Sequence, residues 1–294
     1  MSTVAIIGAG DLGGATAQAL AARDRVNRLL LIDASSKVAA GKALDIRQSG
    51  AVDGFHCAVD STDDFSAVTG AAACIVADRF AAPPVEWHGE DALAMLGRVL
   101  PYASGAPLIF AGVAQAELML RVARELGVAR ERLIGIAPEA FASAVRAIVA
   151  VEARCSPSEV LLSVLGAPPG RRAEGRDASE GGFVVPWSDA SIGGYALERV
   201  LSQVQLTRLD ARARKLWPPG PFTLGLAAAH AAEAIVTSSR RTFSAATLLG
   251  GEFGVRNRIG TLPVRLSREG IAEVRVPALN TRERVRLETV LGAP

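Results

Sequence analysis

The chain has 294 residues and a formal net charge of +2, and hydrophobic residues make up 50% of it. This small charge excludes a strongly basic nucleic-acid-binding protein, and no apolar run reaches the ~18 residues that a membrane span needs. The start, MSTVAIIGAGD, lacks the basic region and cleavage site of a signal peptide. We therefore expect a soluble, cytoplasmic protein with neither nucleic acid nor membrane as a partner.

The cysteines and the paired arginines suggest structural roles. Cys57, Cys74 and Cys155 have neither paired nor metal-like spacing, so we expect buried thiols and no metal site. Short basic clusters such as 171–172 and 240–241 favour solvated faces, with a phosphate or carboxylate partner as the alternative.

Short apolar runs alternate with helical patterns through the first half of the chain. Strands are expected at 4–10, 29–33, 74–77, 107–112 and 132–137, and helices at 12–23, 38–48, 91–100 and 117–126. Continuous apolar strands that alternate with helices predict a parallel sheet covered on both faces. We therefore expect a doubly wound Rossmann domain over residues 1–140.

The pattern changes in the second half, where helices and paired strands mix. Helices are expected at 142–151, 196–216, 224–239 and 281–291, a strand at 159–167, and a hairpin over 262–276 with its turn near Glu269–Gly270. This mixture predicts an α+β domain over residues 141–294.

A glycine fingerprint follows the first strand. Gly8, Gly10 and Gly13 form G-x-G-x-x-G at the start of a helix, and Asp33 ends the next strand. The glycines allow a tight turn, close approach of a pyrophosphate and close helix packing, while the helix N-terminus attracts the phosphates. Asp33 can accept hydrogen bonds from ribose hydroxyls and would repel a 2′-phosphate, so we predict NAD as the cofactor. Asp11 and Leu12 complete the predicted turn.

Several segments resemble the lactate/malate dehydrogenase family. They are GKALD (41–45), the strand and helix at 132–150, WSDASIGG (187–194), the helix at 220–235, GGEFGV (250–255) and LPV (262–264). The resemblance covers nearly the whole chain and implies the family's two-domain fold, an NAD(H) cofactor and a homodimer or homotetramer. The turn 76-VAD-78 matches T-A-G in the family, which adds Ala77 to the predicted cofactor contacts.

The resemblance also identifies the positions of the family's catalytic side chains. In the family a histidine donates a proton, an aspartate orients it, one arginine polarises the substrate carbonyl and another clamps its carboxylate. Here the histidine position is Pro168 or Pro169, Phe141 replaces the aspartate and Ala144 replaces the clamping arginine. Arg146 alone remains of that L-D-x-x-R-x-R pattern.

The mobile loop and the nicotinamide side depart from the family as well. The loop reads 83-PPVEWHG-89, with Pro83 and Gly89 at its two arginine positions, and N-P-V-D is replaced by 112-GVAQ-115. These independent losses predict that the standard dehydrogenase chemistry is absent.

Few residues are available as replacements. His56 is expected at the surface and His230 in helix packing, whereas His88 on the closing loop is a weak candidate acid/base, with Asp78, Arg79 or Arg98 as possible neighbours. The 171–182 stretch, whose charged residues are Arg171, Arg172, Glu174, Arg176 and Asp177, resembles an insertion that either lines the cavity or forms a surface loop.

Three hypotheses remain open. The first is an NAD(H)-binding, catalytically degenerate relative that acts as a sensor, scaffold or partner subunit. The second is an NAD-dependent oxidoreductase for a substrate other than a simple 2-hydroxy acid. The third is a protein that keeps the fold and binds no nucleotide.

Overall fold

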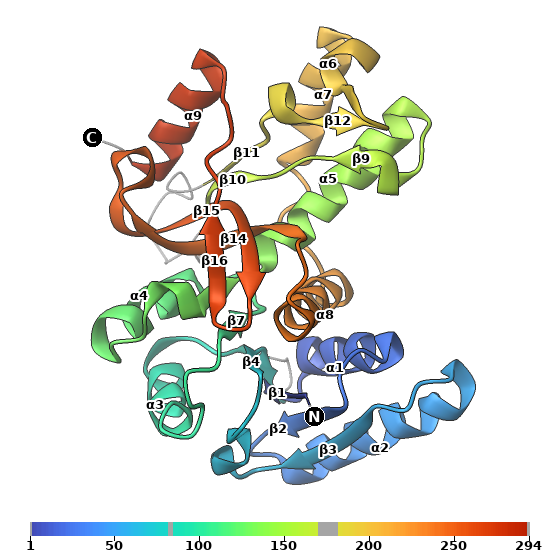
Figure 1. Ribbon diagram of the computed structural model, residues 1–294, viewed down its shortest axis with the longest axis vertical. Helices are drawn as coiled ribbons and strands as arrows, with labels where there is room; N and C mark the ends of the chain where they lie inside the picture. Colours follow the sequence, from blue (N-terminus) through green and yellow to red (C-terminus); the bar gives the residue numbers. More distant parts are fainter. Residues whose placement is uncertain (1, 82–84, 170–181, 293–294) are drawn as a thin grey trace.

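The computed structural model describes residues 2–81, 85–169 and 182–292 (Figure 1). An 11-stranded sheet runs through this part of the chain. Its parallel portion has the strand order β3-β2-β1-β4-β7-β8, which is the order of a doubly wound Rossmann sheet. The elements of this portion are β1 (Thr3–Ile7), α1 (Asp11–Arg23), β2 (Arg28–Ile32), α2 (Ser36–Asp53), β3 (Ala58–Thr62), β4 (Ala73–Val76), α3 (Gly89–Val99), β7 (Leu108–Phe110), α4 (Ala116–Glu125) and β8 (Leu133–Gly135).

Alternate side chains of the parallel strands enter two separate cores. Val4 and Ile6 of β1 pack with α1, α2 and the later helix α8 (Pro221–Thr237), whereas Ala5 and Ile7 pack with α3 and α4. All four side chains are fully buried. Because both faces are covered, the strands are apolar without interruption, as the sequence predicts.

The second half of the chain continues the same sheet with antiparallel strands. Strand β14 pairs with β8 and then with β15, which also pairs with β10 and β16. The elements are α5 (Ala137–Ala153), β9 (Val160–Leu161), β10 (Leu165–Ala167), β11 (Gly182–Val184), β12 (Ser191–Ile192), β13 (Tyr195–Ala196), α6 (Leu197–Val200), α7 (Gln203–Ala213), β14 (Thr242–Gly250), β15 (Arg256–Ser267), β16 (Gly270–Val274) and α9 (Thr281–Leu291). Figure 1 shows this half stacked on the Rossmann half through α5, α8 and the shared sheet.

The structure confirms the predicted fold class and differs in detail. The strand expected at 159–167 is two short strands, β9 and β10, that belong to different sheets. The helix expected at 196–216 is divided because Ser202 accepts a hydrogen bond from the Gln205 N–H and starts α7 as a new helix. The predicted boundary at residue 140 falls inside the continuous helix α5, so the division into two domains stays a prediction.

Two cysteines agree with the expected buried thiols and one does not. Burial raises the pKa of Cys57 to about 11 and that of Cys74 to about 12. Cys155 is half-buried, because it follows the last turn of α5 near the surface. None of the helices in the described ranges is long and apolar enough to cross a membrane.

The contact between α1 and α8 requires a glycine. A Cβ atom on Gly225 would lie 2.8 Å from the Thr16 nitrogen and 2.9 Å from the Ala15 carbonyl carbon, both in the backbone of α1. By contrast, a Cβ atom on Gly97 in α3 would meet no atom within 4 Å.

We therefore predict opposite effects for two identical substitutions. Gly225→Ala should lower the free energy of unfolding by about 1–3 kcal/mol, because the helices must separate. Gly97→Ala should raise it by about 0.5–1 kcal/mol, because alanine favours the helix. Urea unfolding followed by circular dichroism measures both, and a Gly225→Ala protein as stable as wild type would contradict the close packing.

Candidate functional site

The glycine turn between β1 and α1 leaves no space for side chains at Gly8 and Gly13, as its pattern predicts. Gly8 has a φ of 110°, and its N–H donates to the Ile32 carbonyl oxygen at 2.7 Å. A Cβ atom on Gly13 would lie 2.0 Å from the Gly8 carbonyl oxygen. A side chain at either position would therefore displace the backbone.

The anion position of this turn is occupied by a side chain of the protein. The Asp78 carboxylate accepts hydrogen bonds from the backbone N–H groups of Leu12 at 3.0 Å and Gly13 at 2.8 Å. A Cβ atom on Gly10 would lie 2.3 Å from Asp78 Oδ2. Asp78 is 4% exposed, and burial raises the pKa of its carboxyl group. Its carboxylate thus lies on the amide groups where the fingerprint predicts a pyrophosphate.

Asp33 is also engaged by backbone donors. Its Oδ2 accepts from the N–H groups of Ala9 at 2.8 Å and Phe80 at 3.1 Å, while Oδ1 accepts from Ser35 at 2.9 Å. The side chain is buried, with 3% of the residue exposed. Ribose hydroxyls can therefore reach Asp33 only if the backbone at Phe80 moves away.

A second carboxylate, that of Glu86, is held by the turn that follows β7. Strands β5 (Asp78–Arg79) and β6 (Val85–Glu86) form a short antiparallel pair that returns the chain to this turn. There Glu86 accepts from the N–H groups of Val113 at 3.0 Å and Ala114 at 2.9 Å. A Cβ atom on Gly112 would lie 2.4 Å from Glu86 Oε2, so the glycine in place of the family's asparagine makes room for this carboxylate.

These hydrogen bonds use the groups that are predicted to bind NAD. The residues predicted to hold NAD, which are Gly8, Gly10, Asp11, Leu12, Gly13, Asp33 and Ala77, are together at the carboxyl ends of β1, β2 and β4. In this conformation the amide groups of Leu12 and Gly13 and the carboxylate of Asp33 are hydrogen-bonded within the protein itself. The predicted neighbour relation between Asp78 and His88 is not seen, because Asp78 points to α1 instead.

The positions that correspond to catalytic residues lie in an aromatic environment. Phe141 of α5 is 3% exposed and stacks on Phe183 with ring centroids 4.8 Å apart, while Trp217 packs edge-on at 6.1 Å. Phe141 and Pro169 line one cavity of about 900 Å³. The structure therefore brings the aspartate and histidine positions together, with no titratable group at either.

The space beside the predicted nicotinamide side is very small. Pro168, Gly112 and Gln115 line a cavity of about 10 Å³, together with apolar residues of α4, α5 and β14. The Gln115 side chain is engaged with its surroundings, because its Oε1 accepts from the Gly112 N–H at 2.8 Å and its Nε2 donates to the Ala77 carbonyl oxygen at 3.2 Å. A cavity of this volume holds no substrate.

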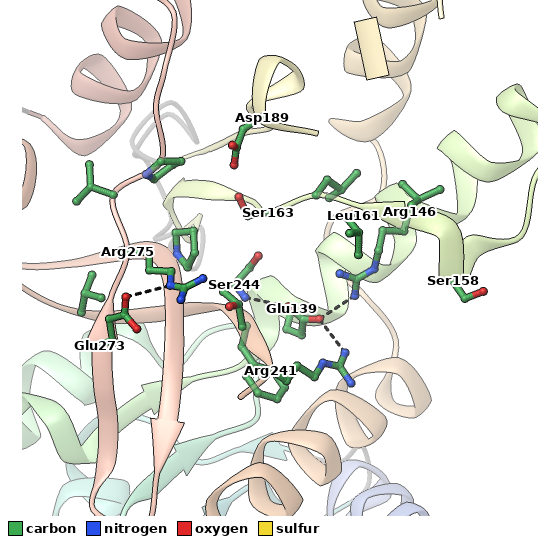
Figure 2. A pocket seen from close by; sticks show the side chains of 18 of the residues that line it. Glu139, Arg146, Ser158, Leu161, Ser163, Asp189, Arg241, Ser244, Glu273 and Arg275 are labelled. Atoms are coloured by element: carbon green, nitrogen blue, oxygen red, sulfur yellow. Dashed lines mark hydrogen bonds and ion pairs between the residues drawn. The ribbon is translucent and has the colours of Figure 1, made fainter. Parts of the chain in front are cut away.

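A larger open cavity of about 1030 Å³ lies around a buried carboxylate (Figure 2). Glu139 accepts from Arg146 at 2.7 Å, from Arg241 at 3.3 Å and from the Ser244 N–H at 2.9 Å. Arg146, the surviving family arginine, is thus held by a carboxylate of the chain. Arg241 is exposed, as expected, and it also has the carboxylate partner that was the alternative, since it pairs with Glu139. Sequence reasoning missed Glu139, and its only signal is an acidic residue in the first turn of a buried helix.

The histidines occupy three different environments. His56 is exposed, with its Nδ1 3.3 Å from Asp24 Oδ2, as expected for a surface residue. His88 precedes α3, and no hydrogen bond joins its ring to another residue in the described ranges. His230 of α8 is half-buried beside Arg241, as expected for a packing residue.

The described residues include no metal site and almost none of the predicted insertion. Within the described ranges, no group of three His, Cys, Asp or Glu side chains is placed to hold a metal ion. Of the 171–182 stretch, the structure describes Gly182 alone, so its proposed role in the cavity lies outside the described residues.

His230 predicts a pH dependence of stability. Burial, together with Arg23 and Arg241, lowers the pKa of His230 to about 4. An unfolded histidine titrates near about 6.5, so the unfolded chain binds the proton first as the pH falls. The contribution of neutral His230 is therefore complete above about pH 6.5 and is lost as the pH falls toward about 4.

Replacing the ring should weaken this dependence. His230→Gln should lose less stability than wild type between pH 7 and pH 4.5, as measured by urea unfolding at each pH. An unchanged slope in His230→Gln would contradict the assignment.

The chain is similar in sequence to malate dehydrogenases along most of its length. No sequence-family model matches the chain. A malate dehydrogenase from Chlorobium phaeobacteroides is 27% identical over 289 residues, which cover 92% of this chain and 89% of that protein. One from Sorangium cellulosum is 28% identical over 303 residues, or 97% of this chain and 92% of the relative.

Solved structures share the fold over almost the whole chain. The malate dehydrogenase from Salinibacter ruber has a TM-score of 0.82 at 23% identity and covers 99% of this chain and 94% of its own. A minor L-lactate dehydrogenase from Enterococcus mundtii has a TM-score of 0.83 at 19% identity, with coverage of 99% and 95%. The chain is thus similar in sequence to malate dehydrogenases and shares the fold of malate and lactate dehydrogenases over almost its whole length.

Proposed function

We propose that this protein is an NAD(H)-binding member of the lactate/malate dehydrogenase family that does not carry out the family's hydride transfer. The observation that carries the proposal is the cavity shared by Phe141 and Pro169. Proton transfer to a substrate oxygen needs a titratable group within hydrogen-bond reach. Aromatic and proline side chains stand where the family has its aspartate and histidine, so the family's proton donor is absent. The one carboxylate that lines this cavity in the described ranges, Asp210, is paired with Arg214 and Arg286.

The electrostatics of this region support the same conclusion. A buried carboxylate without a partner carries a large desolvation cost. Once the histidine is absent, Phe141 packed against Phe183 and Trp217 is the more stable choice. Arg146 does not replace the lost carboxylate clamp, because it is paired with Glu139.

Binding of NAD(H) is supported by the family resemblance and by the preserved turn. The fingerprint glycines lie at the start of α1 and Asp33 follows β2, as the dinucleotide-binding fingerprint requires. Since Asp78 uses the same amide groups, binding requires that Asp78 leaves them. A protein that changes conformation with its nucleotide and performs no turnover acts as a sensor, scaffold or partner subunit. By the same resemblance we propose a cytoplasmic homodimer or homotetramer.

One observation favours a second candidate, a fold that binds no nucleotide. Asp78 satisfies the donors of the turn as a phosphate would, so the protein is stable without a ligand there. The oxidoreductase alternative gains no comparable support from His88, and its other candidates, in the 171–182 stretch, lie outside the described residues except for Gly182.

Turnover should be absent. With malate or lactate and NAD⁺, or with oxaloacetate or pyruvate and NADH, we expect rates at least about 10³-fold below those of a malate dehydrogenase assayed in parallel, because acid–base catalysis alone contributes about 10²–10⁴-fold. Absorbance at the NADH band measures this. A rate above buffer that His88→Ala or Asp33→Ala abolishes would contradict the proposal.

Binding should nevertheless be measurable. Titration with NADH, followed by cofactor fluorescence, should saturate at millimolar concentration or below. No binding in that range would favour the second candidate.

A further inference from the structure

We propose that residues 78–81 and 85–88, here called the occluding segment, form an internal competitor that holds the dinucleotide site closed until NAD(H) displaces it. The inference rests on the proposed binding of NAD(H). It assigns the site a closed state, in which a carboxylate of the chain replaces the phosphate, and an open state that binds the nucleotide.

The first observation is that Asp78 acts as a substitute anion. Its two carboxylate oxygens accept from Leu12 and Gly13, the first N–H groups of α1. These groups carry the positive end of the helix dipole and have no partner inside the helix. A carboxylate and a pyrophosphate cannot use the same two donors, and their like charges repel each other at this distance.

The second observation is that the segment covers the groove at two further points. The Phe80 N–H donates to Asp33, the residue predicted to bind the ribose. Glu86 accepts from Val113 and Ala114, next to the turn that faces the nicotinamide in the family. The occluding segment therefore contacts the predicted phosphate, ribose and nicotinamide parts of the groove.

The third observation is that a glycine leaves space for each of the two carboxylates. Gly10 lies against the Asp78 carboxylate and Gly112 against the Glu86 carboxylate, each at a distance that excludes a Cβ atom. Both carboxylates are thus seated in gaps that glycines provide.

Both carboxylates of the segment are held by polar contacts that a ligand can replace, whereas Trp87 packs against the core formed with α3 and α4. Asp78 and Glu86 are held by backbone N–H groups, and Arg79 lies 5.7 Å from the centre of the Trp87 ring within the segment itself. A nucleotide supplies replacement partners for the donors of α1 and for Asp33. A closed state lowers the apparent affinity by the fraction of molecules that are open, so an open fraction of about one per cent weakens binding about 100-fold.

Asp78→Gly tests the proposal, because it removes the competing carboxylate and restores the glycine of the family's turn. We expect this variant to bind NADH at least about tenfold more tightly than wild type. Glu86→Gln should give a smaller gain, since it weakens one end of the closed state. Glu117→Gln, an exposed carboxylate on α4, is the charge control and should bind as wild type does.

Tryptophan fluorescence gives an independent measurement. Saturation with NAD⁺, which does not absorb tryptophan emission, should change the fluorescence of wild type as Trp87 leaves its site. The change should disappear in Trp87→Phe and should be smaller in Asp78→Gly, where the segment is already released.

The outcomes separate this inference from the proposed function. Equal NADH affinity in folded wild type and Asp78→Gly overturns the occluding segment and leaves NAD(H) binding standing. Absence of binding in both, at millimolar NADH, overturns both. Thermal melting by circular dichroism checks folding. If Asp78→Gly is unfolded, Asp78→Asn, which removes the charge and keeps the shape, decides by the same criteria.

Discussion

The hydrogen bonds from Leu12 and Gly13 to the Asp78 carboxylate are the interaction on which the state of the site depends. The N-terminus of α1 presents N–H groups that require an acceptor, and in a dinucleotide-binding fold that acceptor is a phosphate. Here the chain supplies its own. The same contact orients β5, and through β6 it brings Glu86 to the far end of the strand edge.

In the region that corresponds to the catalytic centre, other side chains also take the place of the family's functional groups. Where a proton donor and its carboxylate partner would be needed, Phe141, Phe183 and Trp217 form an aromatic cluster, and Pro168 borders a cavity too small for a substrate. The phosphate position is covered by the Asp78 carboxylate, which uses N–H groups that a nucleotide can also use. The chemical centre instead keeps a cavity of about 900 Å³ beside Phe141 and Pro169, where apolar side chains replace the family's titratable groups.

Much of the fold could be predicted because its signals are local. Apolar runs identified the inner parallel strands, and the glycine turn with Asp33 identified the cofactor region. Strand β3 was missed because its sequence, AVDST, is polar and lies at the sheet edge, and β14 was missed because much of TFSAATLLG is small or polar. Their places depend on the neighbouring strands.

The decisive contacts of the site could not be predicted, since they join distant parts of the chain. Asp78 and Gly13 are 65 residues apart, and Arg241 and Glu139 are 102 residues apart. The sequence shows that the family's glycine is replaced by Asp78, but only the fold shows that its carboxylate reaches the N-terminus of α1. A crystal structure at saturating NADH is the most direct test. The account predicts a dinucleotide on Gly8–Gly13 with Asp78 displaced, and either a dinucleotide bound while Asp78 keeps both hydrogen bonds or no dinucleotide would contradict it.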